Sequence, residues 1–148
     1  MTRRSYAAPI DAVEAMTIDL PALPMKQLSP NAFKALHRWA QTSAIQGQRE
    51  AWLVMLHERL GPPPYPEFDT YTITFRLYGV GMRTDTGSWC GHWGLKVLED
   101  CLTRPRANKF YGLGILIDDS PKYYKQRNVE VYPDGEARTV VTITSVEA

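Results

Sequence analysis

Two adjacent aspartates, Asp118 and Asp119, directly follow an apolar run at residues 113–117. Carboxylates placed side by side resist joint ionisation, and a divalent cation relieves that repulsion. Mg²⁺ prefers a few carboxylates together with water, so the pair is a candidate metal site. The alternative is that Asp118, Asp119, Ser120 and Pro121 form a turn, for which these residue types are equally suited. The motif by itself leaves both interpretations open.

A second group of polar residues lies earlier in the chain, around a glycine-rich loop. Arg83 and Asp85 lie in that loop, His92 comes just before an expected helix, and Lys96 lies on the helix. Lys96 and Asp100 are four residues apart and therefore share a helix face. An ordinary surface ion pair would also explain that spacing.

Basic and aromatic residues alternate around the aspartate pair, although the whole chain is almost neutral. The formal net charge is +1, from 17 basic and 16 acidic residues, so composition alone gives no general attraction to nucleic acid. The basic residues between positions 104 and 127 are Arg104, Arg106, Lys109, Lys122, Lys125 and Arg127. They predict a local DNA-binding surface around the two carboxylates, with a solvated loop as the alternative.

The elements that would position these residues predict an α/β (α+β) fold in a single small domain. The chain has 148 residues, 44% of them hydrophobic, which suits one domain with a real core. Alternation and turn signals predict strands at 17–20, 69–78 and 113–117 and helices at 29–60 and 93–102. A closing hairpin is expected from 128–132 and 137–146 across the turn at 133–136. The expected order is β-α-β-α-β-β-β, giving a mixed sheet with two helices packed on it.

The sequence also predicts the domain boundary and the location of the protein. Residues 1–16 are expected to be a flexible N-terminal extension, with the domain spanning 17–148. They include arginines but no apolar stretch behind them, which argues against a secretory signal. No apolar run approaches the ~20 residues needed to cross a bilayer, so no membrane partner is expected. Cys90 and Cys101 are expected to be reduced thiols, which fits a cytoplasmic location.

Taken in order, these features resemble the RusA family of Holliday junction resolvases, small endonucleases common in phages and prophages. The resemblance covers roughly residues 17–146 and includes the opening strand and proline loop TIDLPALPMKQLSPN. Its most specific part runs from the helix KVLEDCL at 96–102 to the segment GILIDD at 114–119. The closing VTIT segment at 141–144 matches the final strand of the family pattern.

The resemblance implies a homodimeric, Mg²⁺- or Mn²⁺-dependent enzyme that hydrolyses phosphodiester bonds at a four-way DNA junction. If phage-encoded, it would act in the host cytoplasm. By position, Lys96 and Asp119 would be the catalytic residues, with Asp118 beside the latter at the metal. Metal held by the carboxylates would activate water, and the lysine would offset transition-state charge. Arg83 would join the basic residues between 104 and 127 as a DNA contact.

One family motif is altered. Where the family has Asp-x-Asp-Asn before the short helix, this chain has Cys90, His92 and Trp93. Asp85 and His92 are the expected replacement metal ligands. Three hypotheses follow: an active endonuclease with a rearranged site, a degenerate relative that binds branched DNA or a protein without cutting, and an unrelated interaction protein whose aspartate pair is a turn.

Overall fold

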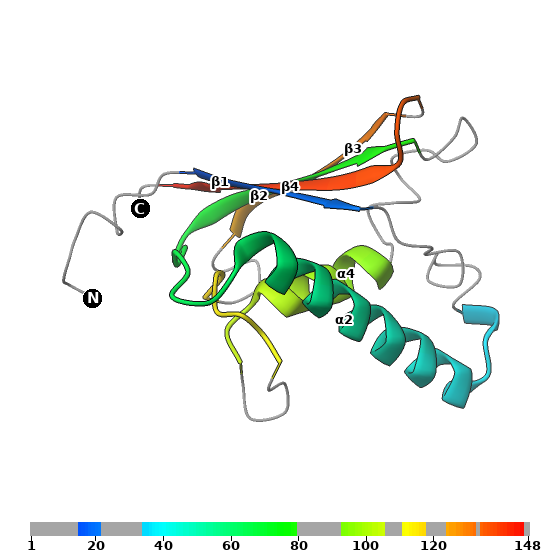
Figure 1. Ribbon diagram of the computed structural model, residues 1–148. Coiled ribbons are helices and arrows are strands. Elements are labelled where there is room, and N and C mark those ends of the chain that lie inside the picture. Colours follow the sequence, from blue (N-terminus) through cyan, green and yellow to red (C-terminus); the bar gives the residue numbers. More distant parts are fainter. Residues whose placement is uncertain are drawn as a thin grey trace.

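The computed structural model has an α+β architecture in which two helices cover one face of a four-stranded sheet (Figure 1). It describes residues 15–21, 34–79, 93–105, 111–117, 124–132 and 134–146, with the side chains of Trp93, Gly94 and Lys125 excepted. The elements, in chain order, are β1 (Ala15–Pro21), α2 (Arg38–Leu60), β2 (Tyr71–Tyr78), α4 (Trp93–Leu102), β3 (Tyr124–Tyr132) and β4 (Arg138–Ser145). The predicted fold class is confirmed.

Helix α2 begins later than the sequence predicted. His37 has extended backbone (φ −62°, ψ 151°) and its ring accepts a hydrogen bond from the Trp39 amide, so the helix starts at Arg38. The expected start at residues 29–31 lies outside the described residues. The helix ends at Gly61, whose φ of 72° suits glycine, and prolines follow, as predicted.

The strand order β1-β4-β2-β3 contradicts the predicted C-terminal hairpin. β2 lies between β3 and β4, pairing parallel with β3 and antiparallel with β4. The connection after Tyr132 therefore crosses the end of β2 rather than making a two-stranded turn. Two strand spacings are about 10 Å, which a five-residue connection can span. The chain does reverse between β3 and β4, as predicted, but the prediction that β3 and β4 pair with each other was wrong.

Alternation along β2 divides the sheet into two faces, as its sequence predicted. Tyr71, Ile73, Phe75 and Leu77 are buried on the face covered by the helices. There they form one core with residues of both helices, including Trp52, Leu56, Leu95, Leu98 and Leu102. Thr72, Thr74, Arg76 and Tyr78 lie on the opposite face, called here the open face, which neither helix covers (Figure 1).

Residues 113–117, predicted as a strand of the sheet, make only isolated bridges. Leu116 bridges Phe68 and Thr103, both in parallel. Ile115 and Leu116 are nevertheless fully buried, so the apolar run does reach the core. Its residues fill the gap between the start of β2 and the end of α4 rather than adding a strand.

Candidate functional site

The structure describes only some of the predicted site residues. Lys96 lies on α4, Arg104 follows that helix, and Arg127 lies on β3. Lys125 is also in β3, without a described side chain. The remaining predicted site residues lie outside the described residues: Arg83, Asp85, His92, Arg106, Lys109, Asp118, Asp119 and Lys122. Their predicted roles stay predictions.

The backbone that leads to the aspartate pair is held on both sides. The Ile117 amide donates to the Phe68 carbonyl at 3.2 Å, and the Phe68 amide donates to the Ile115 carbonyl at 2.8 Å. On the other side, the Arg104 amide donates to the Leu116 carbonyl at 2.8 Å. The segment that immediately precedes Asp118 is therefore bound to the start of β2 and to the chain just after α4.

Gly112 permits the close approach that makes this arrangement feasible. A Cβ at this position would collide with the carbonyl of Thr103. The Leu113 amide, next in the chain, donates to the Cys101 carbonyl at 2.8 Å. Segment 111–117 thus packs directly on the backbone at the end of α4, which only glycine at position 112 allows.

Helix α4 presents Lys96 to solvent and is attached to β3 one turn later. Lys96 is exposed, whereas Glu99 is buried. The Nε of Arg127 donates to Oε1 of Glu99 at 2.8 Å, and the Arg127 guanidinium lies 5.2 Å from the ring centroid of Phe75. The register of β3 places Arg127 opposite Ile73, on the helix-covered face. This ion pair and the buried Leu95, Leu98 and Leu102 hold α4 against the sheet.

Two of the predicted DNA contacts therefore lie in different surroundings. Arg127 is engaged beneath the sheet with Glu99, so its guanidinium already has a protein partner. Arg104 is about half exposed and lies 3.7 Å from Glu67, a loose surface pair that water can open. Arg104 also follows the backbone that holds Leu116.

Cys101 belongs to the core and not to a reactive site. It is fully buried, and its thiol lies 3.8 Å from the carbonyl of Arg49. Burial, with the nearby Asp100 carboxylate, raises its pKa to about 12. Because metal binding requires the thiolate, Cys101 is a poor ligand at neutral pH. Within the described ranges, no three His, Cys, Asp or Glu side chains come together as a metal-binding group.

The open face carries a polar network that the sequence reasoning did not identify. Arg76 donates to Glu130 at 3.0 Å and to the Thr142 hydroxyl at 3.1 Å, and the Tyr132 hydroxyl donates to Glu130 at 2.8 Å. Those hydrogen bonds, from Tyr132 first and Arg76 second, lower the pKa of Glu130. Glu130 in turn raises the pKa of Arg76 and of Tyr132.

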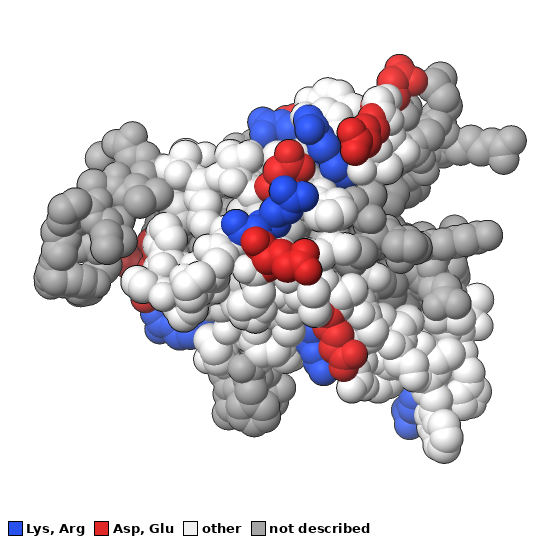
Figure 2. Space-filling model, viewed as in Figure 1, with Lys and Arg blue, Asp and Glu red and all other residues white. Residues whose placement is uncertain are grey.

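A row of stacked side chains crosses the end of the same face. The rings of Tyr78 and Tyr132 stack at 4.8 Å, and the Arg138 guanidinium lies 4.6 Å from the Tyr78 centroid. Arg138 also pairs with Asp19 at 3.6 Å. Over the sheet, in the upper part of Figure 2, basic and acidic side chains are interleaved. The alternation of β2 was a usable signal for Arg76 and Tyr78, but their partners follow from the strand order.

No protein-family model matches this chain, and no curated protein matches it significantly. None of the described helices combines the length and the apolar character needed to cross a membrane. The resemblance to the RusA family therefore rests on the residues and the order of elements given above.

Proposed function

We propose that this protein is a metal-dependent endonuclease that resolves Holliday junctions or other branched DNA by phosphodiester hydrolysis, acting as a homodimer. The observation that carries the proposal is the anchoring of segment 111–117. Its hydrogen bonds to Phe68 and Arg104 put the residue before Asp118 on rigid backbone. Carboxylates that follow rigid backbone lose less freedom on binding a cation than carboxylates in a long loop.

The donors proposed for the metal suit Mg²⁺ or Mn²⁺. Asp118 and Asp119, with Asp85, would supply hard oxygen ligands, and His92 a nitrogen that Mn²⁺ accepts more readily than Mg²⁺ does. When bound, such a cation activates water and stabilises the charge of the transition state.

The chain's own side chains would do the remaining work. Lys96 is exposed on α4, the helix that the Glu99–Arg127 pair joins to β3. It would offset negative charge that develops on the scissile phosphate. Arg104 would hold a neighbouring phosphate and fix the DNA register.

A second candidate function is binding of branched DNA without cutting. The observation that favours it is the altered motif, in which Cys90, His92 and Trp93 occupy positions that are Asp, Asp and Asn in the family pattern. A site that has lost two carboxylates would bind a hard cation less tightly. The DNA-contacting cations would be unaffected by that loss.

The test is cleavage of a labelled four-way junction with Mg²⁺ or Mn²⁺. We expect Asp119→Asn to reduce the rate by more than about a hundredfold, because even supporting residues of metal sites are worth 10–100-fold. We expect Lys96→Met to reduce it by about 10²-fold or more, as for other groups that stabilise transition-state charge.

Two matched variants control for general charge effects. Asp134→Asn changes an exposed aspartate in the β3–β4 connection, and Arg59→Gln removes an exposed cation from the last turn of α2. Both should cleave like the unmodified protein. Junction binding, measured separately in EDTA, distinguishes the two candidates. Binding without cleavage by the unmodified protein would contradict the endonuclease proposal and favour the non-cutting binder.

A further inference from the structure

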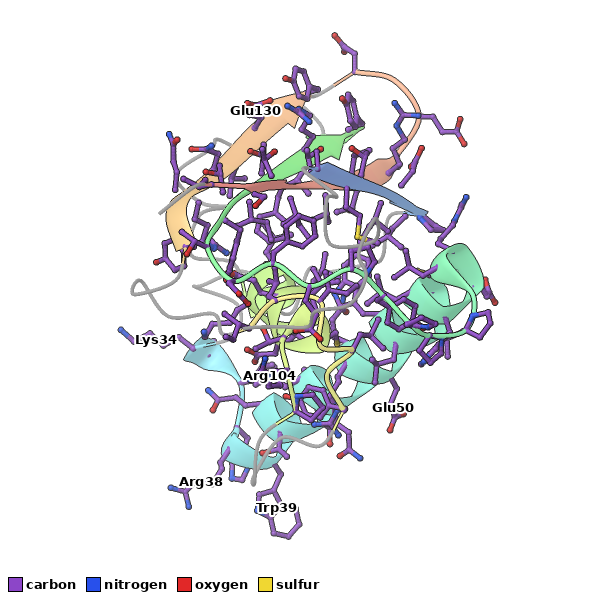
Figure 3. The ribbon with its side chains drawn as sticks, turned by 90° about the vertical axis from the view of Figure 1, so that its left-hand side faces the viewer. Lys34, Arg38, Trp39, Glu50, Arg104 and Glu130 are labelled. Atoms are coloured by element: carbon purple, nitrogen blue, oxygen red, sulfur yellow. The ribbon has the colours of Figure 1, made fainter. Side chains whose placement is uncertain are left out.

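The N-terminal end of α2 presents an indole to solvent close to one cation, Arg38, with a second cation, Lys34, before the helix. Trp39 is 78% exposed, whereas Trp52 on the same helix is fully buried. Lys34 and Arg38 are also exposed, and Arg38 directly precedes Trp39 in the chain. In Figure 1 this end of α2, coloured cyan, projects away from the sheet. Figure 3 shows Arg38 and Trp39 pointing outward at the bottom of the molecule, with Lys34 pointing outward higher on the same side.

The backbone that carries this indole is ordered by local hydrogen bonds. His37 Nδ1 accepts from the Trp39 amide at 3.3 Å, and the His37 carbonyl accepts from the Gln41 amide at 2.9 Å. The Thr42 hydroxyl donates to the Arg38 carbonyl at 3.3 Å. Trp39 therefore extends into solvent from a hydrogen-bonded helical turn.

The charged residues close to Trp39 in the sequence are all basic. The sequence has no Asp or Glu between Asp19 and Glu50. The ion pairs of the described residues involve neither Lys34 nor Arg38. At the lower right of Figure 2, where α2 begins, a small blue patch is surrounded by white side chains, unlike the mixed charges over the sheet. This surface therefore favours an anionic partner.

The face of α2 that continues from Trp39 is polar, which argues against a partner that binds an apolar stripe. The residues three, four and seven positions after Trp39 are Thr42, Ser43 and Gln46, all exposed. A helix that docks in a protein groove, or lies on a membrane, needs apolar residues at those positions. A two-fold contact with a second copy would bring Lys34 and Arg38 against their own equivalents, which like charges oppose.

We propose that Trp39 stacks on an unpaired base of single-stranded or branched nucleic acid while Arg38 binds a neighbouring phosphate and Lys34 binds a phosphate further along the strand. An aromatic ring beside cations matches a base with its backbone, because every base offers a face for stacking and every linkage carries a charge. The base must be unpaired, since bases inside a duplex have both faces covered. The inference requires no cleavage and goes beyond the proposed function, whose DNA contacts lie elsewhere in the chain.

The test is fluorescence anisotropy in EDTA with three labelled probes: a single strand, the matching duplex and a four-way junction. Trp39→Ala should weaken binding of the single strand about tenfold, the size typical of one base–aromatic stack. Trp39→Phe should restore most of that affinity, and duplex binding should be unchanged. Loss of junction affinity together with single-strand affinity, at unchanged duplex affinity, would identify the bases at the junction's branch point as a second source of the ligand.

The cations are tested by salt dependence. Replacing Lys34 and Arg38 with Gln should reduce the slope of log K against log salt for the single strand by about 1.4, since each phosphate contact contributes about 0.7.

Val54→Ala is the matched control for Trp39→Ala, because Val54 is also an exposed apolar residue of α2, at 58%. It should bind like the unmodified protein.

Three results would overturn the proposal. They are an affinity of Trp39→Ala within twofold of the unmodified protein, an equal loss on all three probes, and sedimentation showing a dimer that Trp39→Ala dissociates. The last would mean that a second copy covers this surface. Because the experiment contains no metal, a failure of cleavage leaves its outcome unaffected, and the two proposals fail separately.

Discussion

Two arginine–carboxylate pairs lie on opposite faces of the sheet and differ mainly in burial. Arg127 and Glu99 join β3 to α4 on the covered face, with an Nε–Oε1 distance of 2.8 Å. Arg76 and Glu130 join β2 to β3 on the open face, at 3.0 Å. Side-chain exposure is 19% and 5% in the first pair but 35% and 43% in the second. Similar geometry thus occurs in two different dielectric environments.

The difference shows which pair organises the molecule. A charge beneath the sheet has lost most of its water, so removing its partner leaves a cost that solvent cannot offset. A pair on the open face stays hydrated, and salt screens it. The covered pair joins the helix that carries Lys96 to the sheet, whereas the open pair joins two strands on the solvent-exposed face. The comparison therefore predicts unequal effects from the loss of each arginine.

The largest expected effect follows from removing the covered arginine. Arg127→Met keeps much of the side-chain volume but takes the guanidinium away from the Glu99 carboxylate. We expect the free energy of unfolding to fall by about 3 kcal/mol, as for other broken buried pairs. Urea unfolding measures it as a lower midpoint at an unchanged slope.

A double variant sharpens this test. Arg127→Met combined with Glu99→Leu removes both charges, so it should be more stable than Arg127→Met alone. A loss below about 1 kcal/mol in the single variant would mean that the covered pair behaves like a surface pair.

A middle-sized effect tests the strand order on which the comparison depends. Arg76 faces Glu130 because β2 lies beside β3. Since β2 also lies beside β4, the β3–β4 connection passes the end of β2 at Gly79. Gly79 has a φ of 69°, and a Cβ there would lie 2.8 Å from the Gly135 carbonyl oxygen and the Ala137 backbone. Gly79→Ala should destabilise the protein by about 2 kcal/mol.

Gly47→Ala is the matched control for that variant. Gly47 lies within α2, and a Cβ there meets nothing within 4 Å. This substitution should stabilise the protein by up to about 1 kcal/mol, because alanine favours helix. Equal effects of the two substitutions in urea unfolding would contradict the crossing of β2 by the connection.

The smallest expected effect comes from the open pair. Arg76→Gln should change the free energy of unfolding by less than about 1 kcal/mol at neutral pH, and by less still in about 1 M salt. The folded-state pKa of Glu130 is lowered, so its contribution is present above the unfolded pKa of about 4.3. It is lost as the pH falls through the lower folded-state pKa.

Urea unfolding of Glu130→Gln and the unmodified protein across acidic pH checks that sign. The stability difference should shrink as the pH drops below about 4 and remain constant from pH 5 to 7. A difference that grows on acidification would mean that Glu130 is not stabilised as a carboxylate.

Local patterns were enough for several elements. The helix predicted at 93–102 has those bounds in the structure, because its apolar spacing and the following Thr103, Arg104 and Pro105 are local signals. The alternation at 69–78 correctly separated core residues from open-face residues. Of the site residues predicted from sequence, Lys96, Arg104 and Arg127 lie where side chains are described.

Other predictions failed because they depended on distant partners. Pro133, Asp134 and Gly135 favour a reversal, yet no local rule says whether the two strands pair or admit a third between them. Arg127 was predicted as one of several exposed cations, but the register of β3 turns it toward α4. A shift of one residue would have placed it on the open face, because strand side chains alternate.

The sequence by itself determined which residues alternate, where α4 and α2 stop, and that an apolar run ends at Asp118 and Asp119. Tertiary structure alone decided that β2 separates β3 from β4, that residues 113–117 fill a gap instead of extending the sheet, and that Arg127 and Arg76 face different environments. The physical reason is the distance along the chain over which each signal acts. Turn, cap and alternation signals act over a few residues, whereas strand order is chosen by the burial of the whole covered face at once.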